Sequence, residues 1–316
     1  MSAEPAPGPT PAERATPEAA DELPLSIVVL NYNTRDALSA CLRSIEGSEG
    51  VPCLEVFVVD NASSDGSADM VAEHFPGMSL IRSATNGGYA CGNNLALTHA
   101  RGRYVLLLNP DTEFGPTVLA QMLEYMDANP DVASAGPKVL MPDGRLDLAC
   151  RRGFPTPSVA FYRLFGLSRL FPRSPRFGRY NFTYLDPDEE ADVDSVVGAF
   201  MLVRREVIDQ VGLLDERFFM YGEDLDWAYR MKERGWRIRY NPRVQVLHQK
   251  GASSRKTSQR TTVAFYRSMH LFHDKHFRAR TFAPLNWLIV GAIYLLMGWS
   301  LFKNAFRRPE RRRVST

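Results

Sequence analysis

The sequence has little cysteine and almost no net charge. Its only cysteines, Cys41, Cys53, Cys91 and Cys150, form no Cys-x-x-Cys pair. We therefore expect free thiols in a reducing compartment rather than a disulfide scaffold or a zinc site. A formal net charge of +2 over 316 residues argues against nucleic acid as an obligatory partner. With 45% hydrophobic residues, the chain is expected to be globular with a substantial core.

Two further signals are missing. Residues 1–23 are rich in Pro, Ala, Glu and Thr and contain no apolar run that would mark a secretory signal peptide. This composition predicts a disordered tail, and we expect the folded part of the chain to remain in the cytoplasm. A dinucleotide fingerprint is also absent, because Gly87-Gly88 is only a glycine pair. The pair either permits a close backbone approach or forms an ordinary turn before a helix.

Short apolar strands alternate with helices in the first half of the chain. The predicted strands lie at 25–30, 54–59, 78–82 and 104–108. This alternation predicts an α/β fold with a mostly parallel, twisted sheet flanked by helices. Ligands in such sheets bind beyond the carboxyl ends of the strands. The polar loops expected at that edge are 31–34, 60–67, 85–94 and 109–113.

Two residues in this pattern could bind a metal ion. Asp111 follows the strand at 104–108 and could hold a divalent cation against a diphosphate, or it could be a turn residue after Pro110. His248 ends the strand-like apolar run at 244–248. It is either a satisfied structural residue or a ligand for a transition-type cation such as Mn²⁺.

Three carboxylates crowd into the first turn of one predicted helix, at about 223–234. They are either acids that complement the helix dipole or a functional cluster. Because successive helical residues turn by about 100°, Asp224 and Asp226 point in nearly opposite directions. We assign Asp224 to a cleft and Asp226 to an ion pair with Arg230, four residues on. Glu223 stays open between an acceptor contact and a helix cap.

Two segments favour contact with an anionic membrane surface. Residues 151–180 contain seven arginines and no acidic residue, interleaved with aromatic residues. Such a segment can be a basic amphipathic element on a membrane, a grip for nucleic acid, or a mobile insertion covering the active site; we favour the membrane. Residues 284–302 contain no charge and could reach about 28 Å as a helix, or form a packed core helix. Because basic residues flank both ends, we favour a re-entrant or in-plane helix.

Taken together, residues 24–280 resemble the family 2 inverting glycosyltransferases of the GT-A fold, and more closely their bacterial rhamnosyltransferase-like branch. The motifs that carry the resemblance are Val28 to Asn33, Val58 to Ser67, Asn86 to Gly88, Leu108 to Asp111, Val197 to Ala199 and Gly222 to Trp227. The resemblance implies a nucleotide-sugar half at 24–140 and an acceptor half at 141–250. A membrane-associating segment with a basic tail would follow at 281–316.

The resemblance also implies roles for individual residues. Asp60 is placed for a pyrimidine ring, and Asp224 matches the general base. Asp111 matches the last acid of the DxD metal motif and His248 its distal histidine ligand, which implies Mg²⁺ or Mn²⁺. The first acid of that motif is Asn109 here, whose carbonyl oxygen could still be a ligand. The other nucleotide-sugar residues implied are Asn31, Asn33, Asn61, Asp65, Asn86, Gly87 and Gly88. The acceptor or support residues implied are Gly198, Ala199, Glu223, Asp226, Trp227 and Arg230.

The implied activity is inverting transfer of a rhamnose-like or other hexose from dTDP-rhamnose or a UDP-sugar. The acceptor would be a lipid-linked or cell-envelope glycan, at the cytoplasmic face of the plasma membrane, with the enzyme peripheral or monotopic. One alternative is a sugar-phosphate nucleotidyltransferase, whose Gly-rich basic loop would stand where this chain has residues 31–34. The other is a non-catalytic, membrane-attached glycan-binding protein, which would not need Asp111, Asp224 and His248 together.

Overall fold

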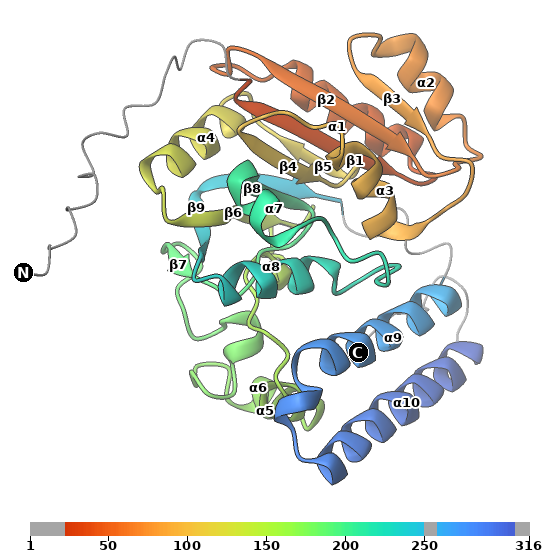
Figure 1. Ribbon diagram of the computed structural model, residues 1–316, viewed down its shortest axis with the longest axis vertical. Coiled ribbons are helices and arrows are strands. Elements are labelled where there is room, and N and C mark those ends of the chain that lie inside the picture. The colour runs from red at the N-terminus through yellow and green to blue at the C-terminus, as the bar shows by residue number, and fades with distance from the viewer. Residues whose placement is uncertain (1–22, 250–257, 307–316) are drawn as a thin grey trace, which may run out of the picture.

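The computed structural model describes residues 23–249 and 258–306. The tail predicted at 1–23, apart from Leu23, and the basic residues after 306 lie outside these ranges. Within them, nine strands form one sheet in the order β3-β2-β1-β4-β8-β6-β9-β5, with β7 beside β9. Helices cover this sheet, and four more helices form a separate layer beyond α8 (Figure 1).

One side of the sheet is parallel, as the alternating pattern predicts. Its strands are β1 (Leu25–Asn31), β2 (Leu54–Asp60), β3 (Ser79–Arg82) and β4 (Tyr104–Leu108). The helices between them are α1 (Arg35–Glu46), α2 (Ser67–His74) and α3 (Gly88–Leu97). The register pairs Asn31 with Asp60, the last residues of β1 and β2. The polar loops after these two strands therefore begin side by side at one edge of the sheet.

The other side of the sheet is mixed. Its strands are β5 (Thr112–Phe114), β6 (Val132–Leu140), β7 (Ala191–Asp192), β8 (Phe200–Arg204) and β9 (Arg237–His248). Strand β8 runs antiparallel to β4 and β6, whereas β6 and β9 are parallel. The helices here are α4 (Val118–Ala128), α7 (Arg205–Val211) and α8 (Glu223–Glu233). The apolar run at 194–203 by itself predicts a strand with Gly198 inside it, at a bulge or a close packing contact. In the structure β8 begins only at Phe200, so Gly198 and Ala199 lie in the turn before it.

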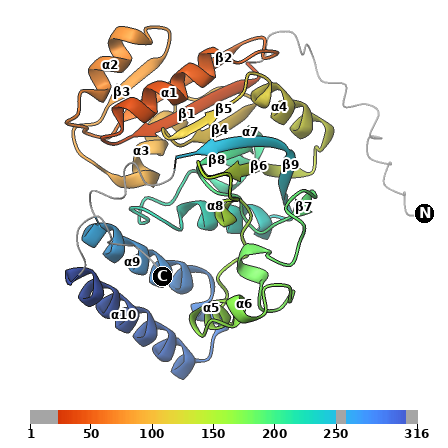
Figure 2. The same ribbon diagram turned by 180° about the vertical axis from the view of Figure 1, so that it is seen from behind.

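The helical layer beyond α8 is formed by residues from two distant parts of the chain. It contains α5 (Pro157–Leu164), α6 (Leu167–Leu170), α9 (Ser258–His276) and α10 (Ala283–Ala305). Short 3₁₀ turns flank these helices at Leu148–Cys150, Arg179–Asn181 and Arg278–Arg280. Both ribbon views place α9 between α8 and α10 (Figures 1 and 2). The sheet and the apolar α10 are therefore separated by two helices, α8 and α9.

The core gathers around β4, whose five residues are all buried. Strands covered on both faces read as continuous apolar runs, and Val105, Leu106 and Leu107 are fully inaccessible to solvent. Trp227 of α8 is also fully buried and belongs to the same core. The sheet and the helix that carries Asp224 therefore share one apolar core.

Truncating this core should destabilise the whole protein. We expect Leu106→Ala to lower the free energy of unfolding by about 2–5 kcal/mol, because it leaves a cavity beside the central strands. The matched control is Leu95→Ala, at a side chain that is 38% exposed, where we expect a change within about 0.5 kcal/mol. Urea denaturation measures both, and equal losses for the two variants would contradict the shared core.

Candidate active site

Asn31 and Asp60 are joined at the carboxyl ends of β1 and β2. Asn31 Nδ2 donates to Asp60 Oδ1 at 3.1 Å and to Ser63 Oγ at 3.1 Å. The backbone N–H of Ser63 donates to the other carboxylate oxygen of Asp60 at 3.0 Å. Asp60 is only 4% exposed, so these bonds hold its carboxylate in one orientation at the edge of the sheet.

Asn33 and Asp65 shape the rim of the same two loops. Asn33 Oδ1 accepts a hydrogen bond from the backbone N–H of Ser64 at 2.8 Å. Asp65 Oδ2 accepts from the backbone N–H of Arg35 at 2.9 Å, at the start of α1. Two of the implied nucleotide-sugar residues thus tie the loop after β1 to the loop after β2.

The loop before α3 is tied to this group through Asn61. Asn61 Nδ2 donates to Asn86 Oδ1 at 3.0 Å and to the Gly88 carbonyl at 3.2 Å, and Gly87 N–H donates to Asn61 Oδ1 at 3.1 Å. Gly88 has a φ of +86°, and a Cβ there would stand 2.2 Å from the Phe219 carbonyl oxygen. The glycine pair therefore permits a close approach of the protein's own backbone, from the segment that leads into α8.

Asp111 and His248 meet across the β5–β9 pairing. His248 Nε2 lies 3.1 Å from Asp111 Oδ1 and 3.5 Å from Asn109 Nδ2. On the other side of the ring, His248 Nδ1 lies 3.6 Å from Asp147 Oδ2. Burial acts to lower the pKa of His248, but the Asp111 and Asp147 carboxylates outweigh it and raise this pKa to about 9. The implied metal ligands are thus brought together, with Asp147 as an additional carboxylate behind the histidine.

Asp224 lies in the first turn of α8, as predicted, but it is not alone there. Its Oδ2 accepts hydrogen bonds from the guanidinium of Arg152 and from the Gly198 N–H, the latter at 3.1 Å. Its Oδ1 accepts from the Leu225 N–H at 2.8 Å. The side chains of Asp224 and Arg152 are 10% and 11% exposed, so this is a largely buried ion pair.

Glu223 is buried beside Asp224, and its Oε2 has no hydrogen-bond partner among the described residues. Burial, followed by the negative charge of Asp224, raises the pKa of Glu223 to about 8. Burial and the neighbouring charge thus favour the protonated form of Glu223, while Asp224 has the Arg152 guanidinium beside it. The two neighbouring acids differ in their surroundings, because only Asp224 contacts the guanidinium.

The turn of Gly198 and Ala199 is hydrogen-bonded to Asp224, to Tyr89 and to the loop at Asn109. Gly198 N–H donates to Asp224, and the Gly198 carbonyl accepts from the Tyr89 hydroxyl, next to the Gly87-Gly88 loop, at 2.8 Å. The Ala199 carbonyl accepts from the Asn109 N–H at 3.0 Å. A Cβ on Gly198 would stand 2.6 Å from the Tyr89 oxygen, so the glycine is needed for this packing. Gly198 therefore lies in a turn that supports the site, and tight packing explains the glycine.

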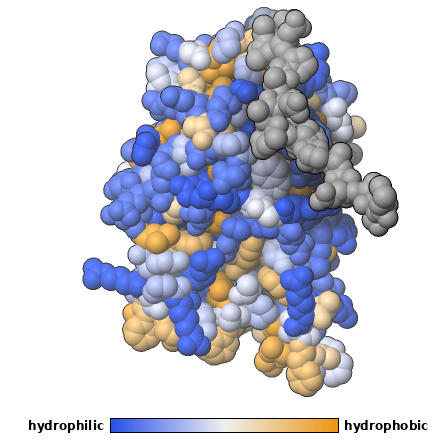
Figure 3. Space-filling view, turned by 60° about the vertical axis from the view of Figure 1, so that its left-hand side comes forward, coloured by the Kyte–Doolittle hydropathy of each residue, from blue (hydrophilic) through white to orange (hydrophobic). Residues whose placement is uncertain are grey.

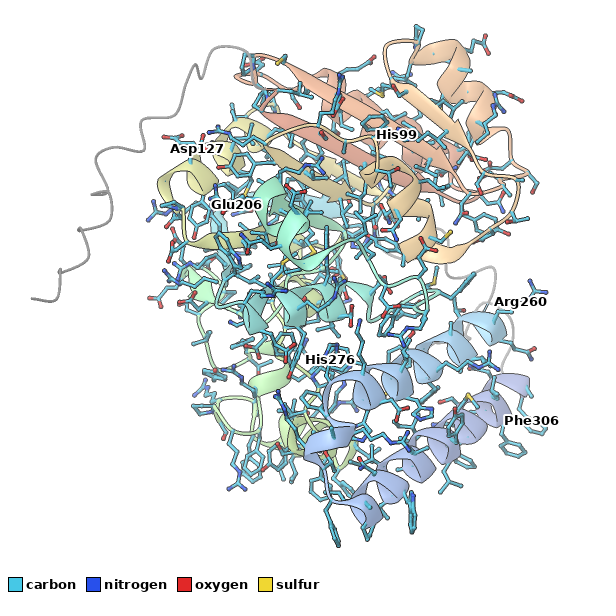
Figure 4. The ribbon with its side chains drawn as sticks, in the orientation of Figure 1. His99, Asp127, Glu206, Arg260, His276 and Phe306 are labelled. Carbon is cyan, nitrogen blue, oxygen red and sulfur yellow. The ribbon has the colours of Figure 1, made fainter. Side chains whose placement is uncertain are left out.

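Asp226 points away from Asp224 and ties α8 to α9. It is fully buried and accepts from Arg230 Nε at 3.0 Å, as predicted, and also from Lys275 Nζ and His276 Nε2, each at 2.7 Å. Burial acts to raise the pKa of Asp226, but hydrogen bonds from His276 and Lys275 hold it below its usual range. Figure 4 shows His276 at the end of α9 that approaches α8. Trp227 packs in the core and donates its Nε1–H to the Gly212 carbonyl at 2.8 Å.

Sequence reasoning missed Arg152, Asp147, Lys275 and His276 as parts of this region. The sequence pattern places Arg152 in the basic segment 151–180, with the arginines that follow it. Its partner in the structure, Asp224, lies 72 positions further along the chain. The arginine-rich, acid-free segment at 151–180 and the cluster of three acids at 223–226 together indicate charge pairing. Charge alone could not show which arginine reaches which acid.

A comparison with protein-family models matches residues 26–212 to glycosyl transferase family 2. The chain belongs to this family.

Several curated relatives are similar along most of their length. The N-acetylglucosaminyl-diphospho-decaprenol L-rhamnosyltransferase of Mycobacterium tuberculosis is 28% identical over 302 residues, covering 92% of this chain and 96% of the relative. Rhamnosyltransferase WbbL of Escherichia coli is 25% identical over 234 residues, covering 70% of this chain and 82% of the relative. The protein is therefore a glycosyltransferase, related in sequence to rhamnosyltransferases, which disfavours a nucleotidyltransferase and a non-catalytic glycan-binding protein.

Solved structures share the fold. The mannosyltransferase PcManGT of Pyrobaculum calidifontis, in complex with GDP-Man and Mn²⁺, superposes with a TM-score of 0.56 at 20% identity, covering 92% of this chain and 75% of that one. Residues 1–349 of Staphylococcus aureus TarS, in complex with UDP-GlcNAc, give a TM-score of 0.54 at 19% identity, covering 90% and 75%. The predicted GT-A type of α/β fold is confirmed.

The protonated state of Glu223 makes stability depend on pH. The pKa of Glu223 rises from 4.5 to about 8 on folding, so the folded protein keeps a proton that the unfolded chain releases as pH rises. Stability from this residue is present below about pH 4.5 and is lost towards about pH 8. Glu223→Gln removes the loss, so its stability relative to wild type should be greater at the alkaline end of this window than at the acidic end.

Urea denaturation near the two ends of that window measures the effect. The control is Glu124→Gln, at an exposed position of α4, whose difference from wild type should not change with pH. A pH-independent difference for Glu223→Gln would show that Glu223 is ionised in the folded protein.

Proposed function

We propose that this glycosyltransferase inverts the anomeric configuration of the transferred sugar and uses Asp224 as its general base. The observation that carries the proposal is the Gly198-Ala199 turn. Its hydrogen bonds connect Asp224 with the loop at Asn109 and, through Tyr89, with the loop at Gly87-Gly88. One turn thus holds a base, a nucleotide-type loop and the loop that carries Asp111, an arrangement that suits a direct transfer between two bound substrates.

The chemistry follows from charge. An acceptor hydroxyl holds its proton far too tightly to be ionised at neutral pH, so a carboxylate must accept that proton as the oxygen attacks the anomeric carbon. Asp224 would accept it, on the face of the sugar opposite the leaving diphosphate. The attack from the opposite face inverts the configuration. This base would be supported by Gly198, Ala199, Asp226, Trp227 and Arg230. Glu223 would lie beside it.

We further propose Mg²⁺ or Mn²⁺ as the cofactor, held by Asp111 and His248. Their facing atoms are 3.1 Å apart, and two adjacent ligands of an octahedral ion at about 2.1 Å lie about 3 Å from each other. Among the described residues no group of three or more His, Cys, Asp or Glu forms a complete metal cage. That arrangement suits an ion that takes its remaining ligands from diphosphate and water. Bound there, the ion would neutralise charge that develops on the leaving diphosphate.

For the donor we propose dTDP-rhamnose or a UDP-sugar, with residues 24–140 as the nucleotide-sugar half and Asp60 directed to the pyrimidine. The rhamnosyltransferase names of the relatives support this choice. For the acceptor, shaped by residues 141–250, we propose a lipid-linked glycan. The support is the Mycobacterium tuberculosis relative, whose name specifies a diphospho-decaprenol acceptor and which matches this chain nearly end to end.

A lipid-linked acceptor requires the enzyme to reach a membrane, and α10 offers the surface. Among the described residues α10 is the only helix long and apolar enough to cross a bilayer, and little of it is buried. Its outer side carries Leu288, Leu295, Trp299 and Phe302, each more than half exposed. Exposed Phe161, Phe165 and Leu170 of α5 and α6 lie near the same end of the molecule, where Figure 3 shows apolar side chains among projecting hydrophilic ones.

We propose that α10 lies in the membrane plane rather than spanning the bilayer. Its inner side packs on α9 through polar pairs along its length: Tyr266 with Ser300 at 2.8 Å, His270 with Tyr294 at 3.0 Å and His273 with Asn286 at 2.8 Å. A spanning α10 would have to leave these partners or draw them into hydrocarbon, which is costly. The enzyme would thus be peripheral or monotopic at the cytoplasmic face of the plasma membrane. An anionic surface would attract the exposed arginines of 151–180, which are Arg163, Arg169, Arg173 and Arg176.

Replacing Asp224 tests the base. We expect Asp224→Asn to lower turnover by about 10²–10⁴-fold, the range a positioned general base contributes, while donor binding survives. Release of nucleoside diphosphate, assayed with dTDP-rhamnose and UDP-sugars plus a membrane extract, measures turnover, and calorimetry measures donor binding. Asp209→Asn, at an exposed residue of α7, is the control and should retain activity. Undiminished turnover in Asp224→Asn would refute the assignment.

Charging the outer side of α10 tests the membrane surface. We expect the double change Leu295→Glu and Trp299→Glu to abolish co-sedimentation with vesicles containing an anionic phospholipid, because both side chains would lie in the lipid. Leu95→Glu, on α3, is the control and should sediment as wild type does. Deleting residues 281–316 should likewise move the protein from the membrane fraction to the soluble one. If both changes leave it on membranes, the 151–180 segment is the anchor instead.

A further inference from the structure

Arg152 differs from the other arginines of its segment in what its guanidinium contacts. Its Nη2 donates both to Asp224 Oδ2 and to the Val196 carbonyl, the latter at 3.0 Å. Its backbone is also held, because Arg152 N–H donates to the Ser195 carbonyl at 2.9 Å and Ser195 N–H donates back at 2.9 Å. The guanidinium is therefore a fixed part of the site rather than a solvated side chain.

The hydrogen bonds of Asp224 distinguish its two oxygens. A carboxylate oxygen can accept about two hydrogen bonds. Oδ2 already accepts two, from Arg152 and from the Gly198 N–H. Among the described residues Oδ1 accepts only one, from the Leu225 N–H. One acceptor position thus remains on Oδ1.

The charges around Asp224 also single out Arg152 as its partner. Glu223 lies next to Asp224 with its pKa raised, and Tyr89 is buried close to both acids. Asp226 is directed to His276 and to two cations of its own, Arg230 and Lys275. Arg152, with Tyr180 also near it, is the cation that contacts Asp224 among the described residues. Without Arg152, an ionised Asp224 would lie in a largely buried site beside another acid.

We propose that Arg152 is a positioning residue for the general base. It engages Oδ2 together with the Gly198 N–H, and so leaves Oδ1 as the oxygen that meets the acceptor hydroxyl and takes its proton. This inference rests on the proposed function of Asp224. It separates Arg152 from the later arginines of 151–180, which we assign to the membrane surface.

The test is Arg152→Ala, compared with Arg145→Ala, an exposed arginine paired with Asp143 in the hairpin after β6. We expect Arg152→Ala to lower kcat by about 10²-fold, at the low end of what a positioned base contributes, with KM for donor and acceptor little changed. Guanidinium ions at millimolar concentration should restore part of the lost kcat in Arg152→Ala but not in Asp224→Asn. Arg145→Ala should keep the wild-type kcat.

A double variant shows whether Arg152 acts through Asp224. If it does, adding Arg152→Ala to Asp224→Asn should cause little further loss, because the positioned base is already gone. Multiplicative losses would overturn the proposal. So would a raised KM for the acceptor with an unchanged kcat, since that result makes Arg152 a substrate-binding residue.

Thermal unfolding checks that each variant is folded. If Arg152→Ala does not fold, Arg152→Lys, which keeps the charge but loses the fork of the guanidinium, carries the test. A lowered kcat at unchanged KM supports the proposal, and a wild-type kcat overturns it. Failure here is distinct from failure of the proposed function, because in the latter case Asp224→Asn itself would turn over normally.

Discussion

The site depends on the hydrogen bonds of one turn, Gly198-Ala199. The turn precedes β8, which lies between β4 and β6 in the sheet, so its position is set by the most deeply buried part of the fold. Its N–H groups and carbonyls connect the base, the Asn109 loop and Tyr89. A small displacement of this turn would change the spacing of all three, and reactions between two bound substrates are sensitive to such changes.

The three acids at the start of α8 show how surroundings divide similar residues. Asp226 is fully buried but contacts two cationic side chains, Arg230 and Lys275, and a histidine, His276. Glu223 is buried without such a contact, and its pKa is raised. Asp224 is paired with Arg152 in a largely buried ion pair. Burial favours the neutral form and a nearby cation favours the ionised form, so the same carboxyl chemistry yields a support, a neutral neighbour and a base. The Asp226 cluster also connects α8 to α9, on which the apolar α10 packs. The proposed membrane surface and the proposed base are thus connected through one helix.

Local pattern was enough to predict the strands of the parallel half, the helix at 223–234 and the orientation of Asp226 towards Arg230. These features depend on residues within a few positions of one another, where periodicity and helical geometry act directly. The prediction that Gly198 and Ala199 lie within a strand was wrong. A run of small and apolar residues has the pattern of a strand whether it pairs in the sheet or forms the turn before a strand. The mixed side of the sheet could not be predicted from local pattern. The antiparallel pairing of β8 with β4 depends on which strands, distant in sequence, reach the open edge of β4.

The sequence by itself determined the α/β fold, the family motifs and the residues that gather at the edge of the sheet. It did so because apolar periodicity and the placing of polar loops after strands are encoded locally. Only the tertiary structure decided that Arg152 meets Asp224, that Asp147 lies behind His248, and that Gly88 admits the backbone of Phe219. Each of these contacts joins residues at least 70 positions apart. Charge and size allow many such pairings, and the packing of the whole sheet selects one.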